Sequence, residues 1–159
     1  QIKAYKLVKQ YRRLGLKCYS IIFFNIESLL RPKEYFVKKI CIAVKRKKKI
    51  DVGNIQNIRD YSWAPEIVNG VSHLNKIKPC DIILASGKGM SGKQIIEYLF
   101  QIKKIDYKNY ITINKNLFRK NEEKFIVSSM NESIKKLKKF KWKPKIYGEK
   151  LLNKIYFGI

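Results

Sequence analysis

The stretch Glu66-Ile-Val-Asn-Gly-Val-Ser-His-Leu-Asn-Lys-Ile-Lys-Pro-Cys-Asp-Ile-Ile83 decides the fold that the sequence predicts, because its pattern returns twice further along the chain. It aligns with residues 94–111 at an offset of 28, and those align with residues 129–146 at an offset of 35. Apolar residues recur at helical spacing in each stretch, which reads as a helix, a short turn and a second helix. Units of 28 to 35 residues are typical of helical-hairpin repeats, although any row of amphipathic helices also aligns with itself.

The chain before this region favours a small α/β unit. Residues 3–14 predict a basic amphipathic helix, and Gly15 stands where a left-handed residue ends a helix. Residues 17–26 are rich in β-branched and aromatic side chains, which predicts a buried strand. A second helix is expected over residues 35–44, and it runs into five consecutive cations at residues 45–49.

The expected fold class is therefore mainly α, with helical-hairpin repeats preceded by a small α/β unit. The small unit covers residues 1–52, and about three hairpins cover residues 63–159. Residues 51–62 contain Gly53 and several amides without clear periodicity, so the boundary is placed there. A chain of 159 residues with 45% hydrophobic residues has room for one ordinary domain or for two small units.

The chain is strongly basic. Lys and Arg number 36 against 12 for Asp and Glu, which gives a formal net charge of +24. Such self-repulsion opposes compaction, so a polyanionic partner is expected, most often nucleic acid or an anionic membrane. Only six of the basic residues are Arg, and Lys, Ile and Asn fill 65 of 159 positions, which is typical of codon drift in an AT-rich genome that replaces Arg with Lys. Drift alone does not explain the deficit of acids.

Cysteine and histidine are too sparse for a zinc site or a disulfide framework. Cys18, Cys41 and Cys80 are widely spaced and odd in number, and His73 is the only histidine, so no metal is expected. The longest apolar run, residues 21–26, is far shorter than a bilayer requires. We therefore expect no membrane span.

The segment Gly87-Lys-Gly-Met-Ser-Gly-Lys93 is close to a phosphate-binding loop. In such a loop glycines let backbone amides cradle phosphate, the lysine reaches phosphate oxygens, and a following hydroxyl holds magnesium. Gln94 cannot supply that hydroxyl, and no later apolar strand ends in an aspartate that would complete the metal site. The same residues fit a capping box, in which Ser91 and Gln94 open a helix over residues 95–105.

No catalytic residue and no cofactor are expected. The acids are scattered, their one adjacent pair, Glu122 and Glu123, lies in a polar stretch, and His73 has no obvious partner. The basic clusters predict phosphate contacts, with Phe140 and Trp142 among them as either base-stacking or core residues. The residues expected to bind RNA are Arg12, Arg13, Lys17, Lys45, Arg46, Lys47, Lys48, Lys49, Lys103, Lys104, Lys135, Lys136, Lys138, Lys139, Lys141, Lys143 and Lys145.

A pattern of residue classes runs through residues 6–44: a basic helix, a turn, a hydrophobic strand with an aromatic end, and a later aromatic pair. It is carried by Lys9, Arg12-Arg13, Leu14-Gly15-Leu16-Lys17, Cys18-Tyr19-Ser20-Ile21, Phe23-Phe24 and Tyr35-Phe36. In these positions the segment resembles the C-terminal half of a RAP domain, although Ile22, Asn25 and Ile26 depart from that pattern. The resemblance, with the following repeats taken as heptatricopeptide-like, implies an organellar RNA-binding protein without nuclease activity.

These observations favour a non-enzymatic RNA-binding protein, most of all a structural component of a mitochondrial ribosome on the matrix side. Its expected partners are ribosomal RNA and neighbouring ribosomal or ribonucleoprotein proteins, and its affinity for RNA is expected to fall steeply with salt. Two alternatives stay open. One is a nucleotide-binding protein that uses residues 87–93, and the other is a basic adaptor on a membrane surface or on another protein.

Overall fold

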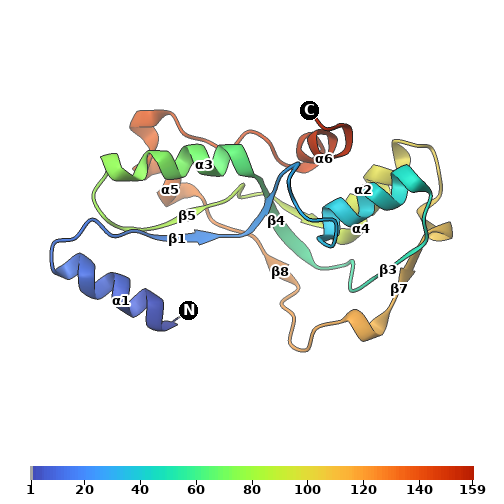
Figure 1. Ribbon diagram of the computed structural model, residues 1–159, viewed down its shortest axis with the longest axis horizontal. Helices are drawn as coiled ribbons and strands as arrows, with labels where there is room; N and C mark the ends of the chain where they lie inside the picture. The colour runs from blue at the N-terminus through green and yellow to red at the C-terminus, as the bar shows by residue number, and fades with distance from the viewer. Residues whose placement is uncertain (1) are drawn as a thin grey trace.

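The computed structural model describes residues 2–159, which form a mixed α/β fold (Figure 1). The expectation of a mainly α protein is therefore wrong. The α-helices are α1 (Ile2–Arg13), α2 (Phe36–Arg46), α3 (Ala64–Ser72), α4 (Gly92–Gln101), α5 (Asn131–Lys136) and α6 (Gly148–Phe157). The strands are β1 (Ser20–Phe23), β2 (Asn25–Glu27), β3 (Ile50–Val52), β4 (Ile58–Trp63), β5 (Asp81–Leu84), β6 (Gly89–Ser91), β7 (Ile111–Ile113) and β8 (Phe125–Ile126). The 3-10 turns are η1 (Leu74–Lys76), η2 (Tyr107–Asn109), η3 (Lys115–Leu117) and η4 (Lys138–Phe140).

Strand β4 is the centre of the largest sheet. β2 and β8 pair with it in parallel, and β6 pairs with it in antiparallel orientation. Two further parallel pairs form between β1 and β5 and between β3 and β7. Parallel neighbours need crossover connections, so every one of these parallel pairs joins segments that are far apart in the sequence. In Figure 1 β4 lies between one group of helices, α2, α4 and α6, and another, α3 and α5.

Helices α2, α4 and α6 pack on one another around the larger hydrophobic core, at the right of Figure 1. Ile40 and Val44 of α2, Ile95 and Leu99 of α4 and Leu152 of α6 are each at most 1% exposed. The four-residue spacing on α2 and on α4 places each pair on one helix face. Burial of each such side chain contributes roughly 1.5–3 kcal/mol, so this core fixes α2, whose first turn borders the cleft described below.

A smaller core lies around β5, beneath α3 and α5 at the left of Figure 1. Ile67 of α3, Leu84 of β5, Leu137 after α5 and Trp142 are buried together. The Trp142 indole N–H donates to the backbone carbonyl of Glu66 at 2.8 Å. Of the two interpretations of Trp142, the core one is confirmed, because a ring buried in this way is not free to stack on a base.

The expected repeats over residues 63–159 are wrong, because the second half of each unit is not a helix. In the first stretch α3 and η1 lead into β5, and in the second α4 and η2 lead into β7. In the third, α5 and η4 lead into irregular chain. The apolar positions that the first two stretches have in common thus belong to units of a helix, a turn and a strand. The short aliphatic run at residues 82–84 forms a strand because β1 lies beside it as a parallel partner.

The local predictions for the first 46 residues are closer to the structure. Helices α1 and α2 lie where helices are expected, and Gly15 follows α1 with φ of +89°. The strand expected over residues 17–26 is two strands, β1 and β2, which pair with β5 and β4 respectively. The boundary between residues 52 and 63 stays a prediction, and β3 on one side of it pairs with β7 on the other. Within residues 2–159 no helix is long and apolar enough to cross a bilayer.

Candidate functional site

A cleft lies along β4, and the first turn of α2 and η3 both line it. Two cavities of about 260 and about 540 Å³ form it, and they share much of their lining. The shared residues are Asn25, Phe36, Gly53, Tyr61, Leu117 and Arg119. These residues come from β2, α2, β4, η3 and two loops, so the cleft depends on the strand pairing that brings those segments together. We call these two cavities together the cleft.

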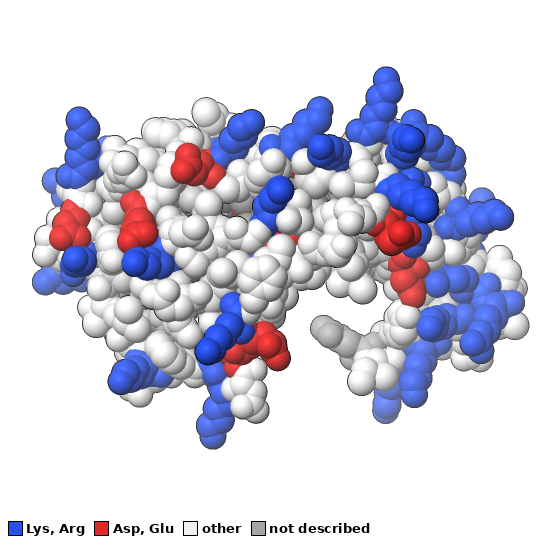
Figure 2. All heavy atoms as spheres, turned by 180° about the vertical axis from the view of Figure 1, so that it is seen from behind, with Lys and Arg blue, Asp and Glu red and all other residues white. Residues whose placement is uncertain are grey.

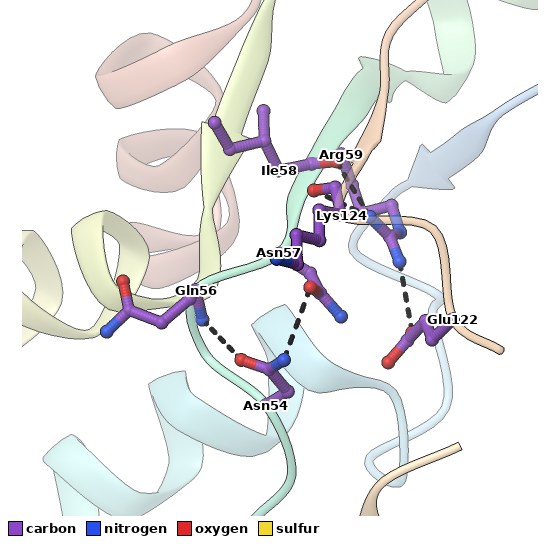
Figure 3. Close-up of polar contacts among 7 residues, drawn as sticks. All are labelled: Asn54, Gln56, Asn57, Ile58, Arg59, Glu122 and Lys124. Atoms are coloured by element: carbon purple, nitrogen blue, oxygen red, sulfur yellow. Dashed lines mark hydrogen bonds and ion pairs between the residues drawn. The ribbon is translucent and has the colours of Figure 1, made fainter. Parts of the chain in front are cut away.

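Arg59 lines the smaller cavity and is held in place by three acceptors (Figure 3). Its Nη1 donates to the carbonyl oxygens of Ile58 at 2.9 Å and of Lys124 at 3.5 Å, and its Nη2 pairs with Glu122 Oε1 at 3.0 Å. The segment that carries Glu122 and Lys124 is close because β8 pairs with β4. A guanidinium has five N–H donors, so Arg59 keeps donors for a ligand while its orientation is fixed.

The loop between β3 and β4 forms a wall of the smaller cavity (Figure 3). Asn54 Oδ1 accepts from the backbone N–H of Gln56 at 2.9 Å, and Asn54 Nδ2 donates to Asn57 Oδ1 at 3.3 Å. An asparagine that bonds to the backbone two residues on stabilises a tight turn. The wall therefore presents the buried Asn57 amide to the cavity in a fixed position.

The remaining residues that line the cleft include both polar and apolar side chains. Asn25 Nδ2 donates to the Asp60 backbone carbonyl at 3.2 Å, which fixes the plane of the Asn25 amide. Arg119 is exposed and borders both cavities, while Phe36 and Leu117 supply apolar surface. Two guanidinium groups with nearby amides suit phosphate oxygens, and an apolar wall suits a ring. The cleft therefore fits an anion that carries a ring.

Two ionisable side chains also border the larger cavity, the buried Glu27 and the half-buried Tyr61. Burial raises the pKa of Glu27 to about 7, against the lowering effect of the nearby Arg31 and Lys38. Burial likewise raises the pKa of Tyr61 to about 12, so its phenol is neutral and able to donate a hydrogen bond. Near neutral pH the cleft thus contains a carboxyl group that is only partly ionised.

Asp60 of β4 is fully buried, and both of its carboxylate oxygens are hydrogen-bonded. They accept from the backbone N–H groups of Ser86, Gly87 and Ser128 at 2.8 to 3.3 Å. The hydroxyls of Ser86 and Ser128 donate to the same carboxylate. Asp60 thus ties β4 to the loop after β5 and to the chain after β8, and it holds the frame of the cleft.

The residues expected to bind RNA do not line the cleft. Figure 2 shows Lys and Arg side chains spread over one face of the protein, with carboxylates among them. Some are engaged within the protein, since Arg12 pairs with Asp81 at 2.8 Å and Lys139 lies over the ring of Phe140. The others lie at the C-terminal end of α1 and just after it, in the last turn of α2 and the residues after it, just after α4, and in or after α5.

The structure brings three of these lysines together around a separate cavity of about 340 Å³, which Lys141, Lys143 and Lys145 border. Glu66 also borders it, and the Glu66 carboxylate accepts the backbone N–H groups of Lys145 at 2.9 Å and Ile146 at 3.0 Å. A carboxylate at this place repels phosphate. The phosphate contacts expected of these three lysines stay a prediction.

The glycine-rich segment 87–93 is not a phosphate-binding loop. The backbone N–H of Gly87 already donates to Asp60 Oδ2 at 2.8 Å. A Cβ atom at Gly89 would lie 2.6 Å from a methyl carbon of Val127 and 2.7 Å from one of Ile58, so the protein itself fills the space in front of this glycine. A phosphate has neither the amides nor the room that the loop would have to provide.

The capping-box interpretation of the same segment is confirmed. The Gln94 N–H donates to Ser91 Oγ at 3.1 Å, and the Ser91 N–H donates to Gln94 Oε1 at 2.8 Å. These reciprocal bonds satisfy two backbone donors at the start of α4. The helix ends at Gln101, four residues earlier than the pattern predicts.

Sequence reasoning missed Asn25, Arg59 and Arg119. Its emphasis on the number of positive charges favoured the Lys clusters and passed over isolated arginines. The scarcity of Arg was the available signal: under the codon drift expected from the composition, an arginine that persists is a candidate for a place where a planar, bidentate cation is needed. Arg59 and Arg119 are two of the six.

Solved structures of other proteins share this fold. The dTDP-glucose 4,6-dehydratase of Bacillus anthracis in complex with NAD superposes with a TM-score of 0.82 at 13% identity, over 94% of this chain and 47% of that one. The UDP-glucose 4-epimerase of Thermus thermophilus in complex with NAD superposes with a TM-score of 0.78 at 13% identity, over 98% of this chain and 51% of that one. At such low identity these likenesses establish the fold, a Rossmann-like α/β arrangement.

Both of those structures contain NAD, which raises the question whether residues 2–159 fit a dinucleotide. Dinucleotides are usually held by a glycine-rich turn whose free amides face the pyrophosphate. The glycine-rich segment 87–93 does not fit, because the amide of Gly87 and that of the preceding Ser86 are bonded to Asp60 and the space at Gly89 is filled. We therefore assign no dinucleotide contact to this segment.

Sequence relatives identify the family. GDP-mannose 4,6 dehydratase 1 of Arabidopsis thaliana is 31% identical over 145 residues, which are 87% of this chain and 39% of the relative. The chain thus spans about two fifths of the length of the curated relatives that it matches. A family model for GDP-mannose 4,6 dehydratase matches residues 2–155.

These matches overturn several expectations. The RAP-like and heptatricopeptide-like interpretation is wrong, because one dehydratase model covers both the segment at residues 6–44 and the region beyond it. The non-enzymatic ribosomal protein with RNA partners is wrong for the same reason, since the matched proteins are enzymes of nucleotide sugars. The organellar location stays a prediction. The chain belongs to the GDP-mannose 4,6 dehydratase family.

Proposed function

We propose that the cleft binds a nucleoside diphosphate sugar, GDP-mannose, and that the chain acts as the sugar-nucleotide-binding part of a 4,6-dehydratase. The observation that carries the proposal is the meeting of Arg59, Arg119 and Asn25 at one cleft. The names of the curated relatives supply GDP-mannose as the ligand to test. The net charge of +24 is consistent with an anionic ligand, although it does not select one.

The two arginines suit the two phosphates of such a ligand. Arg59 is held by Glu122, so a ligand gains its remaining donors without the cost of ordering the side chain. Arg119 is exposed and borders both cavities, so its side chain is free to reach the second phosphate. A guanidinium binds phosphate through two parallel hydrogen bonds, which an ammonium cannot do.

The apolar part of the lining suits the rest of the ligand. Phe36 presents an aromatic ring and Leu117 an aliphatic side chain in both cavities, and Tyr61 contributes a neutral phenol. Rings stack on such surfaces, while fixed amides such as that of Asn57 confer selectivity. The combination is that of a nucleotide site, and it differs from an RNA-binding surface because it is concave.

The test is calorimetric titration of the 159-residue chain with GDP-mannose. Charge-assisted hydrogen bonds contribute about 1.5–3 kcal/mol each, so Arg119→Ala is expected to weaken binding roughly tenfold to a hundredfold. Arg119→Lys is expected to recover only part of this loss, because it restores charge without the bidentate geometry.

Lys135→Ala is the matched control. It also removes one positive charge from an exposed side chain, but Lys135 does not line the cleft. GDP-mannose affinity should be unchanged in this variant. Equal weakening by Arg119→Ala and Lys135→Ala would contradict the proposal, because it would mean that only overall charge attracts the ligand.

A further inference from the structure

Glu27 is a buried carboxyl whose hydrogen-bonding capacity the protein leaves unfilled. It ends β2, opposite Trp63 of β4, and only 2% of its surface is exposed. Its Oε2 has no hydrogen-bond partner in the described chain. The nearest cationic atom, Arg31 Nε, lies 3.9 Å away, which is beyond hydrogen-bonding distance, and it too has no partner. Buried polar atoms are nearly always paired, so this pair of orphans needs an explanation.

The location of Glu27 beside the cleft explains why these two polar atoms have no partner within the protein. It borders the larger cavity of the cleft together with Tyr61 and Arg119. The charged or titratable groups that face it are Arg31 after β2, Lys38 and Cys41 on α2, and Tyr61 on β4. Cys41 and Tyr61 are neutral near pH 7, because burial raises the pKa of each to about 12.

The two cations near Glu27 stabilise its ionised form only weakly, because each interacts with another group. Arg31 is turned toward Tyr35, with its guanidinium carbon 3.7 Å from the centre of that ring. Lys38 donates its ammonium to the backbone carbonyl of Leu29 at 3.1 Å. Burial therefore outweighs both cations, and the carboxyl is close to half protonated at neutral pH.

We propose that Glu27 is the proton-carrying group of the cleft: it takes up a proton from solvent when a nucleoside diphosphate sugar binds, and the resulting O–H donates a hydrogen bond to an oxygen of the ligand. This inference rests on the proposed function. The two negative charges of the diphosphate disfavour a carboxylate in the same cleft, so the neutral acid becomes the favoured form on binding. No covalent bond of the ligand changes, and the one event is transfer of a proton from buffer to Glu27.

Because Glu27 carries a proton when the ligand binds, it selects for a ligand that offers a hydrogen-bond acceptor at this place. A neutral carboxylic acid donates one hydrogen bond and accepts others, whereas a carboxylate only accepts. The ligand must therefore place an oxygen acceptor at Glu27, as a phosphate or a sugar hydroxyl does. Arg31 Nε, which also has no partner, lies 3.9 Å from Glu27 Oε2, so one ligand oxygen beside the two atoms would accept a hydrogen bond from both.

The test is calorimetric titration of the whole chain with GDP-mannose between pH 6 and 8.5, in buffers that differ in ionisation enthalpy. GDP-mannose is suitable because neither of its phosphates has a second ionisation. We expect uptake of about half a proton per ligand at pH 7. We also expect the affinity to fall as the pH rises, by up to about tenfold for each unit above the pKa of Glu27.

Two variants test whether Glu27 is the group that takes up the proton. Glu27→Gln keeps the size and a donor but cannot titrate, so its affinity should not vary with pH and no buffer-dependent heat should appear. Glu132→Gln is the matched control, because it removes a carboxylate from an exposed side chain that borders neither cavity of the cleft. It should keep the pH dependence of the natural chain.

The outcomes separate this inference from the proposed function. Binding with the same pH profile in the natural chain and in Glu27→Gln would overturn the role of Glu27 and leave the proposed function intact. Absence of GDP-mannose binding at every pH would overturn the proposed function and this inference with it. If Glu27→Gln does not fold, carbon NMR of the Glu27 carboxyl in the natural chain decides: we predict that ligand raises its pKa, and an unchanged pKa would contradict us.

Discussion

Two buried acids on neighbouring strands, Asp60 of β4 and Glu27 of β2, have opposite surroundings. Asp60 is wholly buried and accepts hydrogen bonds from three backbone amides and from serine hydroxyls. Glu27 is 2% exposed, has an oxygen without a partner, and faces a cation that lies too far away to bond. β2 and β4 pair in parallel, so the two acids belong to the same sheet.

This difference in hydrogen bonding distinguishes an acid that stabilises the fold, Asp60, from an acid that is available to a ligand, Glu27. A buried charge is tolerated when the fold supplies enough donors, and the fold supplies them at Asp60 because three chain segments converge there. At Glu27 the fold leaves the carboxyl unsatisfied beside a cavity, and burial raises its pKa to about 7. Perturbed groups of this kind concentrate at functional sites, because a ligand can complete what the protein leaves open.

The largest effect is expected when the scaffold acid is removed. Asp60→Ala leaves five hydrogen-bond donors from Ser86, Gly87 and Ser128 without their acceptor. The loss of one partner from a buried charged network costs about 3–5 kcal/mol, so urea denaturation should show a correspondingly lower free energy of unfolding. Asp106→Ala, at an exposed turn, should cost no more than about 1 kcal/mol. Similar losses in the two variants would mean that the Asp60 network does not hold the frame of the cleft.

A smaller effect of opposite sign is expected at Glu27. Its pKa is raised from 4.5 to about 7 on folding, so its contribution to stability is complete below pH 4.5 and is lost as the pH rises to 7. Glu27→Gln does not lose this contribution. The variant should therefore gain stability relative to the natural chain between pH 5 and pH 8, by up to about 3 kcal/mol. Urea denaturation at the two pH values measures the gain. If the free energies of unfolding of Glu27→Gln and of the natural chain differ by the same amount at pH 5 and at pH 8, the contrast between Glu27 and Asp60 is contradicted.

The smallest effect tests the geometry of the Asp60 network itself. Ser128 Oγ donates to Asp60 at 2.6 Å, whereas Ser62 Oγ lies 3.4 Å from it. Ser128→Ala should cost about 1.5–3 kcal/mol, the range for a bond to a charged group, and Ser62→Ala less than about 1 kcal/mol. Thermal unfolding of the two variants ranks them directly. The reverse ranking would show that the shorter bond is not the stronger one.

The sequence predicts the local parts of this fold and not the long-range ones. The helix that ends near Gly15, the helix over residues 35–44 and the capping box at Ser91 depend on residues within four positions of one another, so their patterns are legible in the chain. The strand at residues 81–84 depends on β1, some sixty residues earlier, and a short aliphatic run does not reveal by itself whether it is strand or helix. The predicted hairpin repeats are wrong where such a run is taken as a helix but forms a strand, as at β5 and β7.

The cleft was beyond sequence reasoning for the same reason. Arg59 and Glu122 are 63 residues apart, and only the pairing of β8 with β4 makes them neighbours. Glu27 carries no local signal of burial, because its strand is only three residues long. Counting charges favoured the solvated Lys clusters, whereas the site uses a few cations whose geometry is fixed.

The most direct test of the central claim is NMR observation of the arginine Nε–H signals while GDP-mannose is added. The chain has only six arginines, so the spectrum is simple to assign. We predict that the signals of Arg59 and Arg119 shift with a common saturation curve, while those of Arg12, Arg13 and Arg46 stay in place. Shifts confined to those three, or no shift in any arginine at saturating ligand, would contradict the assignment of the cleft as a nucleotide-sugar site.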